Sequence, residues 1–382
     1  MRTSTRVVTT MDRSPLDEGS QPTSASGIPI RNMWHMLLYS WNEVPFRHDV
    51  SVDVDQSPSL DALLASILAL LIQQRMRVGL GRSYVSEECL LRGIRGRIDF
   101  SESMKKMAFE MGQASCRFQM FTTNSPKNQI VRSTLMHLVQ AGDFGPEKIR
   151  SEELRQILRR LVRYLDGVDL IEITSSFIRR QDLGRNDRDY RLMLAICDLV
   201  LQRQMPTEHV GLKRLLGLDR DSLTLFRIFE RFVANFYRIH LKDWFVKAQH
   251  PLQWHTAKSS QFLPTMVTDL VLRHRKDGRS IVLDTKFTPN SLVRGRSEKL
   301  VFDSSHLYQM YAYLRSQEHV SETLRTASGI LLYPTVQWHL SEQVEVQGHS
   351  IRLETLDLSL PWKAIEARLL GMISADHSEL TQ

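Results

Sequence analysis

Residues 263–287 decide the fold of the C-terminal half, and they read LPTMVTDLVLRHRKDGRSIVLDTKF. Two apolar, β-branched runs flank an Asp277-Gly278 pair, a combination that predicts a β-hairpin. With a two-residue turn at this pair, Asp269 lies directly opposite Lys286 on the neighbouring strand. The stretch therefore predicts two antiparallel strands with charged side chains on their shared surface.

Asp284 is expected beside these two charges, because side chains alternate along a strand and it lies two residues before Lys286. Two carboxylates that lie close together repel each other, and a hard divalent cation bound through oxygen ligands relieves that repulsion. We expect Asp269, Asp284 and the carbonyl oxygen of Thr285 to hold Mg²⁺, with Lys286 orienting water or stabilising charge on a phosphate. These parts suit metal-assisted phosphodiester hydrolysis. The alternative is an exposed hairpin with a surface Asp–Lys pair.

Asp269 followed by Asp284-Thr285-Lys286 resembles the PD-(D/E)xK signature of nucleases, with the proline displaced to Pro264. Five longer segments add to the likeness: IPIRNMWHMLLYSW (28–41), LRGIRGRIDF (91–100), GRNDRDYRLMLAIC (184–197), IFERFVANFY (228–237) and LYQMYAYL (307–314). In this order they resemble the McrC family, the nuclease subunits of the McrBC modification-dependent restriction systems. The likeness extends from about residue 28 to about residue 362. The family more often has Asp-Ala-Lys-Tyr where this chain has Asp-Thr-Lys-Phe.

The resemblance implies an Mg²⁺-dependent endonuclease that cleaves double-stranded DNA at modified cytosine sites, such as 5-methylcytosine. It also implies a partner, a hexameric McrB-like AAA+ GTPase that recognises and translocates the DNA. The N-terminal half would dock into that ring and stimulate its GTP hydrolysis. The sequence has no GxxxxGK[ST] motif, so GTP is expected on the partner and not on this chain.

Three further residues gain a role from the resemblance. In related nucleases an acidic residue on the helix before the catalytic strands can assist the metal site, and Glu230 is the candidate here; a surface glutamate is the alternative. Gln309 and Tyr313 are four residues apart and share a helix face. Their spacing resembles a Gln-xxx-Tyr motif that positions DNA beside the catalytic hairpin.

The expected fold class is α/β (α+β). We expect a disordered tail at 1–27 and a mixed partner-binding domain at 28–210, which docks onto the GTPase ring. A PD-(D/E)xK endonuclease-like domain at 211–382 would follow, with a mixed central sheet flanked by helices. The polar, proline-containing segment 205–211 sets the boundary.

Composition bounds the function classes. The net charge of +7 favours a polyanionic partner such as DNA, although a modest positive charge is also ordinary for a protein of this size. The three cysteines show no zinc spacing and no disulfide framework. The longest apolar run, 62–72, is too short to span a bilayer, so we expect a cytoplasmic protein without a membrane anchor.

Arg92, Arg95 and Arg97 are interspersed with two glycines, which predicts either contact with a partner or DNA, or a glycine-bent strand pair with solvated arginines. Two other functions stay open from the sequence. One is a non-catalytic adaptor that activates the GTPase and binds DNA, and the other is a nuclease that acts without a partner.

Overall fold

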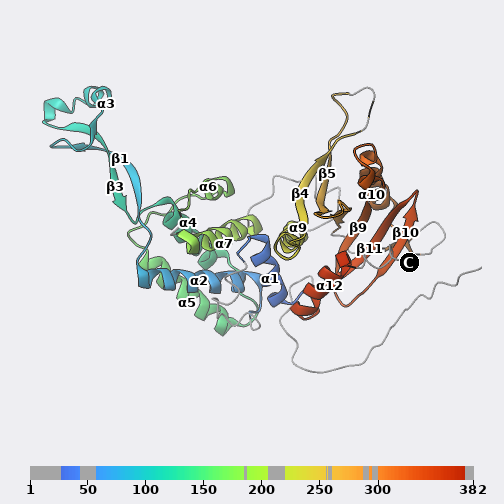
Figure 1. Ribbon diagram of the computed structural model, residues 1–382. Helices are drawn as coiled ribbons and strands as arrows, with labels where there is room; N and C mark the ends of the chain where they lie inside the picture. The colour runs from blue at the N-terminus through green and yellow to red at the C-terminus, as the bar shows by residue number, and fades with distance from the viewer. Residues whose placement is uncertain are drawn as a thin grey trace, which may run out of the picture.

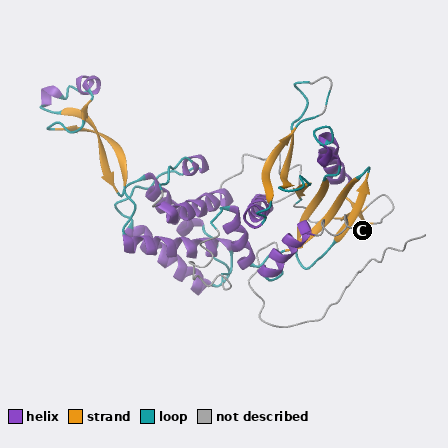
Figure 2. Cartoon of the chain, viewed as in Figure 1, coloured by secondary structure: helices purple, strands orange, loops and turns teal. Residues whose placement is uncertain are grey.

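A computed structural model describes residues 27–43, 57–184, 187–204, 220–254, 256, 260–286, 292–294 and 300–374. The described chain forms a projecting arm, a helical body and a six-stranded mixed sheet with helices on its faces (Figures 1 and 2). The predicted α/β class with a mixed sheet flanked by helices is confirmed. The predicted tail, apart from Gly27, and the predicted boundary at residue 210 lie outside the described residues.

The arm is a narrow antiparallel sheet that extends away from the helical body (Figure 1). Strand β1 (Ser83–Leu91) pairs along its whole length with β3 (Ala114–Thr122), and the short β2 (Arg97–Ile98) pairs with the other edge of β3. Helix α3 (Phe100–Lys105) and a 3-10 helix at Phe109–Met111 lie at the far end. The glycine-bent strand pair that the sequence offers as one alternative for residues 92–100 is thus part of a longer projecting arm.

The helical body lies between the arm and the six-stranded sheet (Figure 2). Its helices are α2 (Leu60–Val78), α4 (Pro126–Ala141), α5 (Lys148–Tyr164), α6 (Ser175–Arg179) and α7 (Arg188–Gln204). The hydrophobic periodicity of residues 60–78 predicts a helix with the bounds that α2 has. No helix within the described ranges combines the length and the apolar character that a membrane span requires.

The large sheet has the strand order β10-β11-β9-β6-β5-β4. Its strands are β4 (Trp244–Leu252), β5 (Met266–His274), β6 (Ser280–Thr285), β9 (Ser328–Thr335), β10 (Ser341–Val346) and β11 (His349–Asp357). β6 is parallel to β9 and antiparallel to β5, so the sheet changes from parallel to antiparallel at the β5–β6 hairpin. All six residues of β6 are buried, as is usual for a central strand with both faces covered.

Two apolar layers cover the sheet. Helices α9 (Arg220–His240), α12 (Trp362–Ser374) and α1 (Ile30–Ser40) pack on one face. Helix α10 (Ser304–Gln317) packs on the other. The remaining short elements are β7 (Leu292–Arg294), β8 (Leu300–Phe302) and α11 (Glu322–Arg325).

Helix α1 packs against elements that are distant in sequence. The Asn32 side-chain amide donates to the carbonyl oxygen of Leu358 at 2.8 Å, and the Tyr39 ring stacks on Trp362 with centroids 5.8 Å apart. Asn235 of α9 donates to the carbonyl oxygen of Tyr39 at 2.9 Å. The apolar density of residues 33–41 predicts burial, and these side chains are core, but their contacts are with the C-terminal half.

Candidate functional site

The β5–β6 hairpin forms with a longer turn than the sequence predicts. The N–H of His274 donates to the carbonyl oxygen of Arg279 at 2.8 Å, which leaves residues 275–278 in the loop. Asp277 stabilises this turn, because its carboxylate accepts the Arg279 N–H at 3.0 Å and contacts the His274 ring at 2.8 Å. Gly278 provides the left-handed conformation, with φ of 73°.

The predicted pairing of Asp269 with Lys286 is therefore wrong. The observed ladder pairs Leu270 with Leu283, and its continuation brings Asp269 to Asp284. The error is a shift of two residues along the strand, which preserves the alternation of side chains between the two faces. Asp269 consequently stays on the same face as Asp284 and Lys286.

The two carboxylates come from the interior of β5 and from the end of β6, and Lys286 directly follows β6. The Lys286 Nζ lies 2.5 Å from Asp284 Oδ2, and the side chain of Asp284 is buried. The Asp269 Oδ2 accepts two hydrogen bonds from Thr285, from its N–H at 2.8 Å and from its hydroxyl at 2.7 Å. Thr285 of β6 is thus hydrogen-bonded to the Asp269 side chain of β5.

The electrostatics of this group suit a bound cation. Burial raises the pKa of Asp284 to about 6, the neighbouring Asp269 charge adds to the rise, and Lys286 opposes it. The buried Asp284 Oδ2 contacts the Lys286 ammonium, and the described residues give it no further hydrogen-bond donor. Two carboxylates and a backbone carbonyl are hard oxygen ligands, which is the set that Mg²⁺ takes while keeping several waters. The residues present therefore fit the expected ion.

Glu230 lies close enough to Asp269 and Asp284 for their charges to affect its pKa. It is half-buried on α9, where Gln249 of β4 donates a hydrogen bond to its carboxylate. Burial, together with the charges of Asp269 and Asp284, raises the pKa of Glu230 to about 7. Among the described residues no three acidic, histidine or cysteine side chains are arranged as a metal-binding cluster. Glu230 therefore adjoins the candidate metal site without closing it.

Gln309 and Tyr313 lie where the motif places them, against the lysine. The Lys286 ammonium donates to Gln309 Oε1 at 2.5 Å, and Gln309 Nε2 donates to the Tyr313 hydroxyl at 2.6 Å. That hydroxyl donates to the carbonyl oxygen of Val267 on β5 at 2.9 Å. Donors and acceptors run in one direction, an arrangement in which each bond polarises the next. Helix α10 thereby fixes the position of the lysine.

The sequence interpretation missed His306. Its ring contacts the Tyr333 hydroxyl at 2.9 Å, and it lies one turn before Gln309 on α10. Burial lowers the pKa of His306, and the positive charge of Lys286 lowers it further. Helical spacing from Gln309 could have identified this neighbour of the lysine.

We expect the binding of Mg²⁺ to depend on pH through Asp284. A carboxyl whose folded pKa is raised above 3.8 favours the folded chain when protonated, and that contribution is lost as the pH rises through about 6. Below this pH the proton competes with the cation, so the affinity for Mg²⁺ should fall about tenfold per pH unit. The measurement is the rise in melting temperature with Mg²⁺ at pH 7.5 and pH 5. An equal rise at both values would contradict the assignment, and Asp284→Asn should abolish the rise at pH 7.5.

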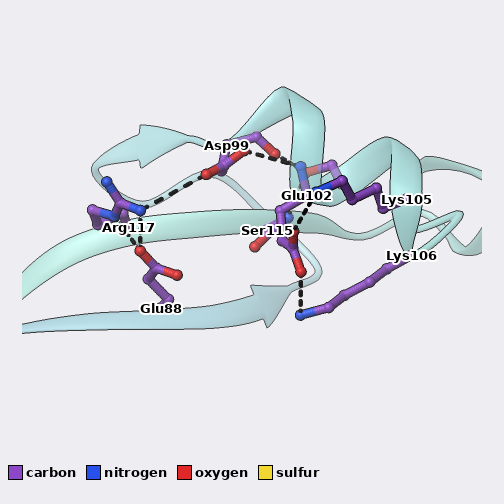
Figure 3. A network of polar contacts seen from close by, with 8 residues as sticks. Glu88, Asp99, Glu102, Lys105, Lys106, Ser115 and Arg117 are labelled. Carbon is purple, nitrogen blue, oxygen red and sulfur yellow. Dashed lines mark hydrogen bonds and ion pairs between the residues drawn. The ribbon is translucent and has the colours of Figure 1, made fainter.

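The far end of the arm is a second candidate site. Six apolar side chains, here called the tip patch, are each 46–74% exposed: Ile94, Phe100, Met104, Met107, Phe109 and Met111. Beside them a polar network fixes the fold of the tip (Figure 3). In this network Arg117 pairs with Glu88 and Asp99, and the Asp99 carboxylate caps α3 by accepting the Glu102 N–H at 2.9 Å.

Of the three arginines singled out in the sequence, the structure gives Arg95 a defined place. Its guanidinium lies over the Phe118 ring, 4.3 Å from the centroid. Arg97 belongs to β2, and Arg92 directly follows β1. All three lie on the arm, on the opposite side of the helical body from the six-stranded sheet (Figure 1).

Comparisons with known proteins agree with this architecture. The model of the family described as McrBC 5-methylcytosine restriction system component matches residues 7–334. The Type IV methyl-directed restriction enzyme EcoKMcrBC of Escherichia coli (strain K12) is 26% identical over 349 residues, 90% of this chain and 97% of that protein. Among solved structures, a half-complex from a tetradecameric assembly of Thermococcus gammatolerans McrB AAA+ hexamers with bound McrC has a TM-score of 0.51. That similarity covers 90% of this chain and 76% of the other at 15% identity, and it concerns the fold.

Proposed function

This chain belongs to the family of McrBC 5-methylcytosine restriction system components, and from that premise we propose that it is the Mg²⁺-dependent endonuclease subunit of such a system. The observation that carries the proposal is the buried Asp284 beside Asp269, with Lys286 held at 2.5 Å. A buried charge is costly unless it is paired with an opposite charge or binds a metal ion. Here Lys286 pairs with Asp284 and the neutral Thr285 donates to Asp269, so a net negative charge is left for a cation.

Asp269, Asp284 and the Thr285 carbonyl oxygen would hold Mg²⁺, which supplies a Lewis acid for the phosphate and lowers the pKa of a bound water. Lys286 would orient the attacking water or stabilise the charge that develops on the phosphate. Gln309 and Tyr313 would keep the lysine in place and contact the DNA, because Gln309 is exposed beside the lysine. Glu230 would assist from the edge of the site as a proton-accepting group, since its pKa lies near 7.

The partner in this proposal is a hexameric AAA+ GTPase. In the Thermococcus gammatolerans assembly McrC is bound to McrB AAA+ hexamers. In this chain the tip patch supports docking of the arm into such a ring, because exposed apolar patches on soluble proteins mark interaction sites. The ring would recognise the methylated double-stranded DNA, hydrolyse GTP and bring the DNA to the nuclease site.

The experiment that tests this function measures cleavage of 5-methylcytosine-containing DNA with Mg²⁺, with and without the partner ring and GTP. We expect rapid cleavage only when the partner ring and GTP are both present. Stimulated GTP hydrolysis without cleavage would instead identify a non-catalytic adaptor. Equal cleavage with and without the ring would identify a partner-independent nuclease.

A further inference from the structure

Both chain connections between the arm and the helical body pass one buried side chain. The arm leaves the body at Gly81, just before β1, and returns at Thr123, just after β3. The two N–H donors of the Asn128 side-chain amide go to the carbonyl oxygens of Gly81 at 2.8 Å and Thr123 at 2.7 Å. Asn128, at the start of α4, therefore holds both ends of the arm together.

Tyr190 completes this arrangement from α7. Its hydroxyl accepts the N–H of Gly81 at 2.9 Å and donates to the Asn128 side-chain oxygen. Both side chains are buried, and the hydroxyl and the amide use their donors and acceptors within the network. A Cβ at Gly81 would lie 2.8 Å from Lys127 Cε and from a ring carbon of Tyr190, so glycine allows the close approach.

Two cationic side chains also contact the ring of Tyr190. The Lys127 ammonium lies 4.8 Å and the Arg75 guanidinium 5.2 Å from the ring centroid. Lys127 pairs with Asp187 at 2.6 Å, and Arg75 pairs with Asp189 at 3.4 Å. Three of these residues belong to the segment GRNDRDYRLMLAIC at 184–197, which has no part in the nuclease site.

Because this network lies at the base of the arm, a small rotation there would displace the far end of the arm by several ångströms. The arm strands pair with one another and extend away from the body (Figure 1), so the base sets the direction of the arm. β1 alone has nine residues, about 30 Å at roughly 3.3 Å each, so a rotation of about 10° at the base moves its far end by about 5 Å.

The network also connects to the nuclease half by direct packing. Tyr190 lies on α7, and α7 packs against α9. Helix α9 carries Glu230, whose pKa is raised in part by the charges of Asp269 and Asp284. A rigid arm could thus transmit force from its tip to α7, and from α7 to the helix beside the candidate metal site.

We propose that Asn128 and Tyr190 form a clamp that fixes the angle between arm and body, so that docking of the arm on the partner ring is transmitted to the nuclease half. They are positioning residues, remote from the DNA and the candidate metal site. The clamp itself rests on the observed contacts, and the transmission rests on the proposed function.

The test measures the arm angle in the full chain by double electron–electron resonance. Spin labels are placed at Glu110→Cys on the arm and Arg160→Cys on α5, both exposed positions, in a Cys89→Ala background, since Cys116 and Cys197 are buried. We expect one narrow distance distribution in the otherwise unchanged chain. Tyr190→Phe and Asn128→Ala should each broaden it about two-fold, because the hinge loses its anchoring bonds. Tyr84→Phe, which removes an exposed hydroxyl on the arm, should leave it unchanged.

The same variants are then assayed with the partner ring, GTP and methylated DNA. Tyr190→Phe keeps the ring between Lys127 and Arg75, so it tests the hydrogen bonds if Asn128→Ala fails to fold. We expect unchanged binding to the ring, with GTPase stimulation and DNA cleavage reduced about tenfold. An unchanged distance distribution would overturn the clamp, and a broadened one with full cleavage would overturn the transmission. A parent chain that never cleaves DNA would refute the proposed function, while the distance distributions would still decide the clamp.

Discussion

Replacement of Lys286 by alanine is expected to reduce DNA cleavage by on the order of 10²–10³-fold, the usual effect of removing one group that stabilises developing charge. Asp284→Ala should have at least this effect, because it also removes a candidate metal ligand. Neither change should prevent assembly with the ring, since Asp284 lies in β6, Lys286 directly follows it, and the proposed docking surface is the arm tip. The measurement is the rate of cleavage of methylated DNA by the assembled complex.

The matched control is Lys276→Ala, which removes a lysine from the exposed loop of the same hairpin. It should leave the cleavage rate and the melting temperature unchanged. If Lys286→Ala lost assembly but kept cleavage, the roles assigned to the two halves of the chain would be wrong.

Substitution of the tip patch should have the other large effect, on the partner. Phe100→Ser with Met104→Ser removes two exposed apolar side chains, each worth roughly 1.5–3 kcal/mol when fully buried in an interface. Binding to the ring should weaken by about 10²-fold or more, and stimulation of GTP hydrolysis should be lost at the same protein concentration. The affinity is measured by titrating the chain onto the assembled ring.

A control with equal exposure exists on the helical body. Ile149 and Tyr164 on α5 are 72% and 70% exposed, and Ile149→Ser with Tyr164→Ser should leave binding unchanged. Equal weakening by the two pairs of substitutions would indicate general loss of stability. Unchanged binding by the tip variant would place the interface elsewhere.

The hairpin shows what local sequence could and could not predict. The Asp-Gly pair and the alternating runs correctly predicted the two strands and the convergence of Asp284 with Lys286. The turn length was wrong, because the Asp277 carboxylate accepts the Arg279 N–H and so stabilises a longer loop. The prediction that Asp269 and Asp284 share a face still holds, because a shift of two residues keeps each side chain on its face.

Contacts between distant segments were beyond the sequence interpretation. The apolar density of residues 33–41 predicted burial, but nothing local indicated that Tyr39 would stack on Trp362. Residues 84–91 and 116–121 each have the pattern of a strand, but their pairing emerged only in the structure. The raised pKa of Glu230 likewise depends on tertiary structure, first through burial and then through the charges of Asp269 on β5 and Asp284 on β6.

We propose that Asp269 and Asp284 share one divalent cation beside Lys286. A structure of the assembled complex with methylated DNA and Mn²⁺ in place of Mg²⁺ tests this, because the anomalous signal locates the ion. We expect an ion about 2.1 Å from an oxygen of each carboxylate, with the scissile phosphate beside it. An ion bound elsewhere, or a DNA-bound complex with none between these two side chains, would contradict it.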